Sequence, residues 1–154
     1  IYTLSLHDAL PILVIFSEAT DKLVAGAIKF AKEVGGQLCV IHIAPADLGF
    51  AMSDIGVQYY PEVEKSETQE SQRLLQRIEE TISQQGIACE TELRQGVAKD
   101  LILDYAEEKN ASYIVMGSHG RSGIYDVFVG SLTKELTKNC PLPVLVIPIH
   151  GKGR

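Results

Sequence analysis

The stretch from residue 113 to residue 148 constrains the fold most strongly, because it reads as strand, glycine-rich loop, helix and strand in direct succession. Residues 113–116, Tyr-Ile-Val-Met, form an apolar run without polar alternation, which is typical of a strand buried on both faces of a parallel sheet. A loop with four glycines follows, from Gly117 to Gly130, and a segment with helical spacing begins directly after it. This order predicts a parallel α/β unit whose backbone can approach a ligand closely.

The glycine-rich loop predicts an anion site. It leaves the carboxyl end of a parallel strand, so that backbone N–H groups and a helix N-terminus point to one spot, which suits phosphate. Gly117 and Gly120 would permit positive φ and close approach, and Gly130 would leave room for phosphate at the helix start. Ser131 and Thr133 add hydroxyl donors in the first helical turn. The alternative on the residues alone is a surface turn with a serine N-cap.

The spacing of the glycines separates this loop from two common nucleotide loops. A P-loop requires Gly-Lys-Ser/Thr, and no lysine follows a glycine of this loop. The dinucleotide fingerprint packs its glycines close together near the first strand, whereas these glycines are spread out and late in the chain. The pattern here is Gly-x2-Gly-x9-Gly-Ser, made by Gly117, Gly120, Gly130 and Ser131.

With this motif the chain resembles the universal stress protein family, specifically its ATP-binding branch. Residues 14–18, 40–43, 116–120 and 143–147 look like family landmarks in the family's order, and they cover about residues 13–149. The resemblance implies a three-layer α/β fold like that of the adenine nucleotide alpha hydrolases. In such a fold, five mostly parallel strands in the order 3-2-1-4-5 form an open sheet with four helices.

The resemblance also implies an adenine nucleotide, ATP with or without Mg²⁺, across the carboxyl ends of the first, second and fourth strands. Carried over position by position, apolar side chains at three strand ends would border the adenine, while the loop and helix start would hold phosphates and ribose. The positions are Val14, Ile43 and Met116 for the adenine, and Gly117, Gly120, Gly130, Ser131, Leu132 and Thr133 for the phosphates and ribose.

His119 and Arg121 are the two loop residues that most suggest a catalytic role. Arg121 can pair with a terminal phosphate, and His119 can bind phosphate, stabilise the loop or stabilise charge on a transferring phosphoryl group. Asp126 is the only acidic residue of the loop, and the sequence offers no pair of a general base and its orienting group. We therefore assign both residues to the binding site and assign no catalytic residue and no metal site.

One position departs from the family pattern. The family places an Asp near the nucleotide at the end of the first strand, and that position is Ile15 here. A lost hydrogen bond costs ~0.5–1.5 kcal/mol, or more if a buried partner is stranded. Ile15 would thus weaken a nucleotide site without abolishing it.

The rest of the chain alternates apolar runs with helical patterns, which predicts strand–helix–strand crossovers and helices on both faces of the sheet. Gly35, Gly86 and Asn110 are expected to end helices. Residues 46–61 lack a period, so we expect a long loop that could cover the site. Expected strands cover residues 13–16, 37–43, 88–94, 113–116 and 143–147, and expected helices precede Gly35 and cover 62–85, 99–109 and the segment after Gly130.

Length and composition fit one domain, because 154 residues with 45% hydrophobic content bury one core and leave no room for a second. We assign this domain to residues 13–149. Residues 1–12 lack an initiating methionine and resemble the in-frame translation of a sequencing-library adapter, so we expect them to be non-native.

Charge and hydropathy exclude several partner classes. The net charge is −6 and the basic residues are scattered, which gives no support for nucleic-acid binding. No run reaches the ~18 apolar residues of a membrane span, and no signal-peptide pattern begins the chain. We expect a cytoplasmic protein with neither a nucleic acid nor a membrane as partner.

Two functional classes fit these expectations. The first is a regulatory stress-response protein that binds ATP, in which occupancy of the site changes the long loop and so a partner surface. The second is a slow ATPase or another nucleotide-processing enzyme on the same site. Loop and helix are present while a general base and metal ligands are not evident, which favours the first class. A nucleotide-free stress protein of the same fold is the third interpretation, favoured by Ile15.

The last strand predicts a homodimer. Residues 141–148 are nearly all apolar, and a last strand at a sheet edge exposes unpaired backbone groups that invite pairing. Pairing across a two-fold axis would protect this edge, and members of the family commonly dimerise in this way. We expect an interface centred on Val144 and Val146.

Overall fold

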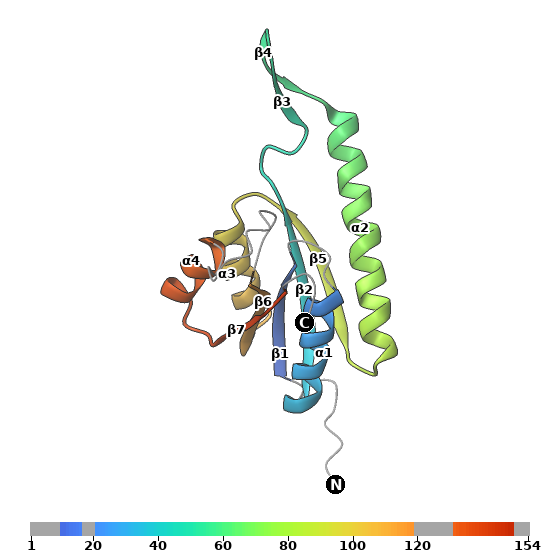
Figure 1. The fold of residues 1–154 in the computed structure, drawn as a ribbon, viewed down its shortest axis with the longest axis vertical. Helices are drawn as coiled ribbons and strands as arrows, with labels where there is room; N and C mark the ends of the chain where they lie inside the picture. The colour runs from blue at the N-terminus through green and yellow to red at the C-terminus, as the bar shows by residue number, and fades with distance from the viewer. Residues whose placement is uncertain (1–9, 17–20, 119–130, 150–154) are drawn as a thin grey trace.

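The computed structural model describes residues 10–16, 21–118 and 131–149. Within them the chain forms a five-stranded parallel sheet of order β5-β2-β1-β6-β7 and a separate antiparallel hairpin, β3–β4 (Figure 1). Without the hairpin strands in the numbering, this is the expected order 3-2-1-4-5. The strands are β1 Leu10–Phe16, β2 Gly36–Ala44, β3 Phe50–Ser53, β4 Gly56–Tyr59, β5 Cys89–Gln95, β6 Tyr113–Gly117 and β7 Val144–Ile147. The helices are α1 Asp21–Val34, α2 Pro61–Gln84, α3 Ala98–Glu108 and α4 Ser131–Asn139.

The helix ends follow from local chemistry. Pro61 occupies the start of α2, where the missing N–H costs nothing, and two glutamates in its first turn suit the positive end of the helix dipole. Gly35, Gly86 and Asn110 have φ values of 68°, 76° and 50°. Each follows the end of a helix by one or two residues, so the expectation that these three residues stop α1, α2 and α3 is confirmed.

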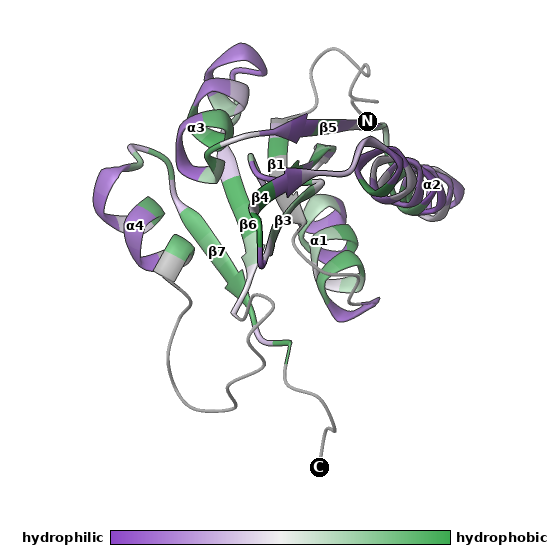
Figure 2. Ribbon diagram, turned by 90° about the horizontal axis from the view of Figure 1, so that it is seen from above, coloured by the Kyte–Doolittle hydropathy of each residue, from purple (hydrophilic) through white to green (hydrophobic). Residues whose placement is uncertain are grey.

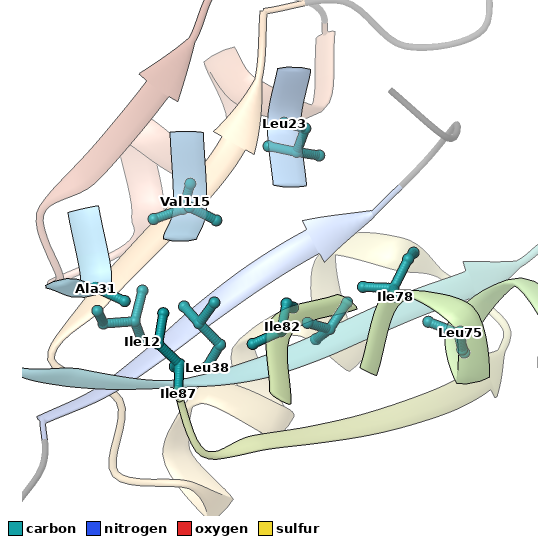
Figure 3. Close-up of a cluster of buried hydrophobic side chains, with 11 residues drawn as sticks. Ile12, Leu23, Ala31, Leu38, Leu75, Ile78, Ile82, Ile87 and Val115 are labelled. Atoms are coloured by element: carbon teal, nitrogen blue, oxygen red, sulfur yellow. The ribbon is translucent and has the colours of Figure 1, made fainter. Parts of the chain in front are cut away.

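Two hydrophobic clusters cover the two faces of the sheet. The first lies under α1 and α2 and joins Leu23 and Ile82 to Leu38 and Val115 of the sheet (Figure 3). The second lies under α3 and α4 and includes Tyr105, which is fully buried. Alternate residues of β2 enter opposite clusters, which is the pattern of a central strand buried on both faces.

Residues 10–12 belong to the central strand. They pair with residues 36–38 of β2, the N–H of Ser112 donates to the carbonyl of Pro11 at 2.8 Å, and Ile12 is fully buried. The foreign origin of residues 1–12 stays a prediction. Whatever their origin, the chain uses Ile12 as core, so the folded unit begins earlier than the expected boundary at residue 13.

Residues 46–61 differ from the expected long loop. They contain the hairpin β3–β4, whose strands are joined by Asp54 and Ile55. Gly56 adopts a φ of 110° after this connection, and the hydroxyl of Ser53 donates to its carbonyl at 3.0 Å. Each strand has four residues, so the period-two alternation of Phe50 and Met52 was too short to stand out from a loop.

The two edges of the main sheet differ in chemistry. Figure 2 shows β5 as a hydrophilic edge and β7 as a hydrophobic one. Arg94 of β5 makes two hydrogen bonds to the carboxylate of Glu108, at 2.5 and 3.2 Å, and its guanidinium lies 5.0 Å from the ring centre of Tyr105. The hydrogen bonds from Arg94 lower the pKa of Glu108, and burial raises the pKa of Tyr105. These charges protect the β5 edge against further strand pairing.

Candidate functional site

The strand order identifies one switch point. From β1 the chain builds β2 and β5 on one side, then crosses to build β6 and β7 on the other side. The direction reverses between β1 and β6, and ligands of open α/β sheets bind at the carboxyl ends of the strands at such a point. The glycine-rich loop begins at Gly117, the last residue of β6, so it leaves the sheet at this switch point.

Three of the expected site residues contribute to one face. Ile43, Met116 and Leu132 all pack into the second cluster, between the sheet and the helices α3 and α4. Met116 is 4% exposed, whereas Ile43 and Leu132 are half-buried and so retain surface for a ligand. The structure therefore brings together residues that lie far apart in the sequence.

Val14 occupies a register position on the other face. It pairs with Val40 and Val115, whose side chains belong to the cluster under α1 and α2. Ile15 is the β1 position in register with Met116. Position 15, where the resemblance implies an Asp, is thus the β1 position in register with Met116. The adenine contact expected from Val14 stays a prediction.

Gly117 has a packing role that was not expected, while its place in the nucleotide site stays a prediction. Its φ lies outside the left-handed region, so positive φ does not explain the glycine. A Cβ at this position would lie 2.8 Å from Cδ1 of Ile149, and the hydroxyl of Ser118 accepts a hydrogen bond from the N–H of Ile149 at 3.2 Å. The segment after β7 therefore packs across the end of β6, and Gly117 provides the space for it.

The start of α4 is the second described part of the phosphate site. Ser131 is the first residue of α4, so the backbone positions 131–133 form its first turn. The N–H groups of a first helical turn have no partner within the helix and favour an anion. His119, Gly120, Arg121 and Gly130 lie outside the described residues, and their assignment to the site stays a prediction.

A depression of about 400 Å³ adjoins Leu132. Its volume lies within the range of small-molecule pockets. The ammonium of Lys99 lies 3.6 Å from the carboxylate of Glu135, which links α3 to α4 beside this depression. Its lining residues are Val97, Ala98, Lys99, Asp100, Leu132 and Glu135.

Sequence reasoning missed the contributions of α3, Ser118 and Ile149 to this end of the sheet. The start of α3 has a sequence signal, since Gly96 directly follows the strand β5 and precedes the helix α3. The contact of Ile149 with Gly117 has none, because it depends on the path of the chain after its last strand.

The described part of the chain has neither a cluster of metal ligands nor a membrane-spanning helix. Among residues 10–16, 21–118 and 131–149, no three His, Cys, Asp or Glu side chains gather around a point where a metal ion could bind. Within the same ranges no helix is both long enough and apolar enough to cross a bilayer.

Comparison with known proteins identifies relatives over nearly the whole chain. The model of the universal stress protein family matches residues 11–148. Universal stress protein YxiE of Bacillus subtilis is 28% identical over 136 residues, which cover 85% of this chain and 92% of the relative. Universal stress protein MJ0531 of Methanocaldococcus jannaschii is 30% identical over 122 residues, 79% of this chain and 70% of the relative.

Solved structures show the same fold. Hypothetical protein MJ0577 of Methanocaldococcus jannaschii superposes with a TM-score of 0.74 at 21% identity, over 93% of this chain and 98% of that one. A universal stress protein of Archaeoglobus fulgidus in complex with dAMP superposes with a TM-score of 0.61 at 22% identity, over 90% and 97% of the two chains. Another universal stress protein, in complex with cAMP, gives a TM-score of 0.64 at 17% identity over 92% and 98%.

At these identities the solved structures establish the fold alone, whereas the family match over residues 11–148 establishes descent. The Gly-x2-Gly-x9-Gly-Ser motif and the strand order agree with it. The chain belongs to the universal stress protein family.

Proposed function

We propose that this universal stress protein binds an adenine nucleotide, ATP in particular, at the carboxyl ends of β1, β2 and β6, and that it acts as a regulatory protein in the cytoplasm. The observation that carries the proposal is the departure of the glycine-rich loop from β6 at the switch point of the sheet. Two relatives of the same fold are in complex with adenine nucleotides, dAMP and cAMP, which supports an adenine nucleotide as ligand.

The described residues fit such a ligand. Ile43 and Leu132 have half-buried apolar side chains on one face of the switch point, which suits the flat apolar surface of adenine. The first turn of α4 follows the loop directly and suits phosphate. Ile15 in place of the family's Asp would remove a polar contact on the face of Met116, so we expect an affinity weaker than that of a site with the Asp.

Two threonines of α4 allow a matched experiment. Thr133 lies in the first turn of α4, where we expect the phosphates, while Thr137 lies one turn later and its hydroxyl donates to the carbonyl of Lys134 at 3.0 Å. Thr133→Val removes one hydroxyl without changing the shape of the side chain, and a hydrogen bond to a charged group is worth about 1.5–3 kcal/mol. ATP titration by calorimetry should show a loss of about tenfold or more for Thr133→Val and no loss for Thr137→Val.

Gly130→Val is a second variant for the same ATP titration. A side chain there is expected to push the phosphates from the helix start and to reduce ATP affinity by about tenfold or more, which is about 1.4 kcal/mol. Parent-like affinity in both Gly130→Val and Thr133→Val would overturn the assignment of the site. Rapid release of ADP, lost in His119→Ala, would instead favour the nucleotide-processing enzyme.

A further inference from the structure

The hairpin β3–β4 has one apolar face, and this face is exposed. Phe50 pairs with Tyr59 and Met52 pairs with Val57 across the two strands. Directly opposite residues and residues two apart share a face of a sheet, so these four side chains lie on one side, which we call the apolar face. Their exposed fractions are 52% for Phe50, 80% for Met52, 64% for Val57 and 48% for Tyr59. The opposite face carries Ala51, Ser53, Gly56 and Gln58.

An exposed apolar face on a hairpin requires an explanation. Antiparallel sheets normally turn their apolar face to the core and their polar face to water. Here the hairpin projects beyond the carboxyl end of the main sheet (Figure 1), and its four large apolar side chains are exposed. Contiguous exposed apolar side chains of this kind mark interaction sites in stable proteins.

The base of the hairpin is fixed to α2. The hydroxyl of Tyr59 donates to the carboxylate of Glu64, and the N–H of Tyr60 donates to the carbonyl of Gly49 at 2.7 Å. A Cβ on Gly49 would lie 3.0 Å from Cβ of Glu64 and from the ring of Tyr59, so backbone and helix pack closely at this point. The apolar face is therefore held in place before a partner arrives, which reduces the entropic cost of binding.

The surroundings of the apolar face are acidic. Glu64 borders it through the hydrogen bond from Tyr59, and this hydrogen bond and the nearby charge of Glu62 both raise the pKa of Tyr59. Residues 46–60 contain no lysine or arginine, and residues 61–70 contain four glutamates and one lysine. We call Glu62 and Glu64 the acidic rim.

We propose that the apolar face and the acidic rim dock a segment of another protein in which apolar residues are accompanied by lysine or arginine. Charge complementarity favours this partner, because the cations would meet the acidic rim while the apolar side chains cover Phe50, Met52, Val57 and Tyr59. A second copy of this chain would bring one acidic rim against another, and an anionic membrane would meet the same repulsion. The proposal is independent of nucleotide binding.

Two labelled peptides and two charge-matched variants test the proposal. The probes are a fluorescein-labelled peptide of alternating lysine and valine and the same peptide with glutamate in place of lysine, both followed by fluorescence anisotropy. Met52→Asp places a charge on the apolar face, whereas Val97→Asp places it on another residue of high exposure, 63%, at the start of α3. We expect the parent to bind the lysine peptide at least tenfold more tightly than the glutamate peptide. Met52→Asp should lose this binding, and Val97→Asp should keep it.

Glu62→Lys reverses one charge of the acidic rim and leaves the four side chains of the apolar face unchanged. It is expected to weaken binding of the lysine peptide several-fold. Circular dichroism of each variant checks that the fold is retained. Equal binding of both peptides, or equal binding by parent and Met52→Asp, would overturn the proposal. So would a dimer that Met52→Asp converts to a monomer in sedimentation, or flotation with phosphatidylserine vesicles that Met52→Asp abolishes, because the face would then serve another partner.

Discussion

Ile12→Ala tests whether residues 10–12 belong to the fold. Ile12 is fully buried in the first cluster, on the central strand β1, in register with Leu38 on one side and Tyr113 on the other. The substitution removes three carbons, which is worth about 2.4 kcal/mol in transfer free energy at about 0.8 kcal/mol each. The cavity left in a tightly held central strand adds to this, so we expect a loss of about 3–4 kcal/mol in the free energy of unfolding.

The assay is urea unfolding followed by circular dichroism, in a chain that begins at Leu10 and so keeps the whole of β1. Met52→Ala is the matched control, because it also removes three heavy atoms but at a side chain that is 80% exposed, and it should change stability by no more than about 0.5 kcal/mol. A chain that begins at Leu13 loses Ile12 and the pairing with residues 36–38, and it should be less stable than Ile12→Ala. An Ile12→Ala variant as stable as Met52→Ala would refute the placement of this segment in the core.

Three further predictions concern packing, assembly and pH. Gly26→Ala puts a Cβ 2.5 Å from Cδ1 of Ile147, so the protein should lose stability, because overpacking outweighs the helix-propensity gain of about 1 kcal/mol. Adding Ile147→Val to this variant should recover most of the lost stability. A Gly26→Ala variant more stable than the parent would contradict this packing of α1 on β7. Leu145→Lys should convert the proposed homodimer to a monomer in sedimentation, because Leu145 is the exposed side chain of the edge strand β7. A variant that stays dimeric would point to another interface. Arg94 lowers the pKa of Glu108 below its ordinary value of 4.5, so this pair stabilises the protein above that value and loses its effect as the pH falls through the lowered pKa. The stability difference between parent and Arg94→Met should therefore shrink in acid, and a difference that stays constant would contradict this reasoning.

The structure changes the choice of residue for testing the homodimer. Val144 and Val146 were expected at the centre of a dimer interface, and β7 is indeed an edge strand. Both side chains, however, pack partly into the cluster under α3 and α4. A charge at position 146 would disturb this cluster as well as an interface, whereas Leu145 is 37% exposed. The homodimer itself stays a proposal.

Long-range order could be predicted from the sequence where the signals are strong. Apolar runs alternating with helical patterns predicted the parallel sheet, and Gly35, Gly86 and Asn110 predicted the helix ends because their positive φ values are rare for other residues. The family resemblance supplied the strand order, which periodicity alone does not contain.

Tertiary contacts explain what the sequence could not predict. The alternation in β3 and β4 covers four residues per strand and points its apolar side chains to solvent, so it lacks the burial signal of a core strand. Gly117 was expected to permit positive φ and close approach of a ligand, whereas the structure shows that it leaves space for Ile149, a residue thirty-two positions later. Such pairwise packing depends on how two strand ends approach each other, which neither segment indicates by itself.

Backbone amide spectra of the isotope-labelled protein during ATP titration test the nucleotide site most directly. The proposed site predicts saturable shifts of the amide signals of Ile43, Gly117, Ser118 and Leu132, at the switch point and the start of α4, with unchanged signals along residues 70–84 of α2. Reduction of these shifts in Thr133→Val, but not in Thr137→Val, would attribute them to the phosphates. Spectra that do not change with ATP, or shifts confined to residues far from the carboxyl ends of β1, β2 and β6, would contradict the proposal that this protein binds a nucleotide at the switch point of its sheet.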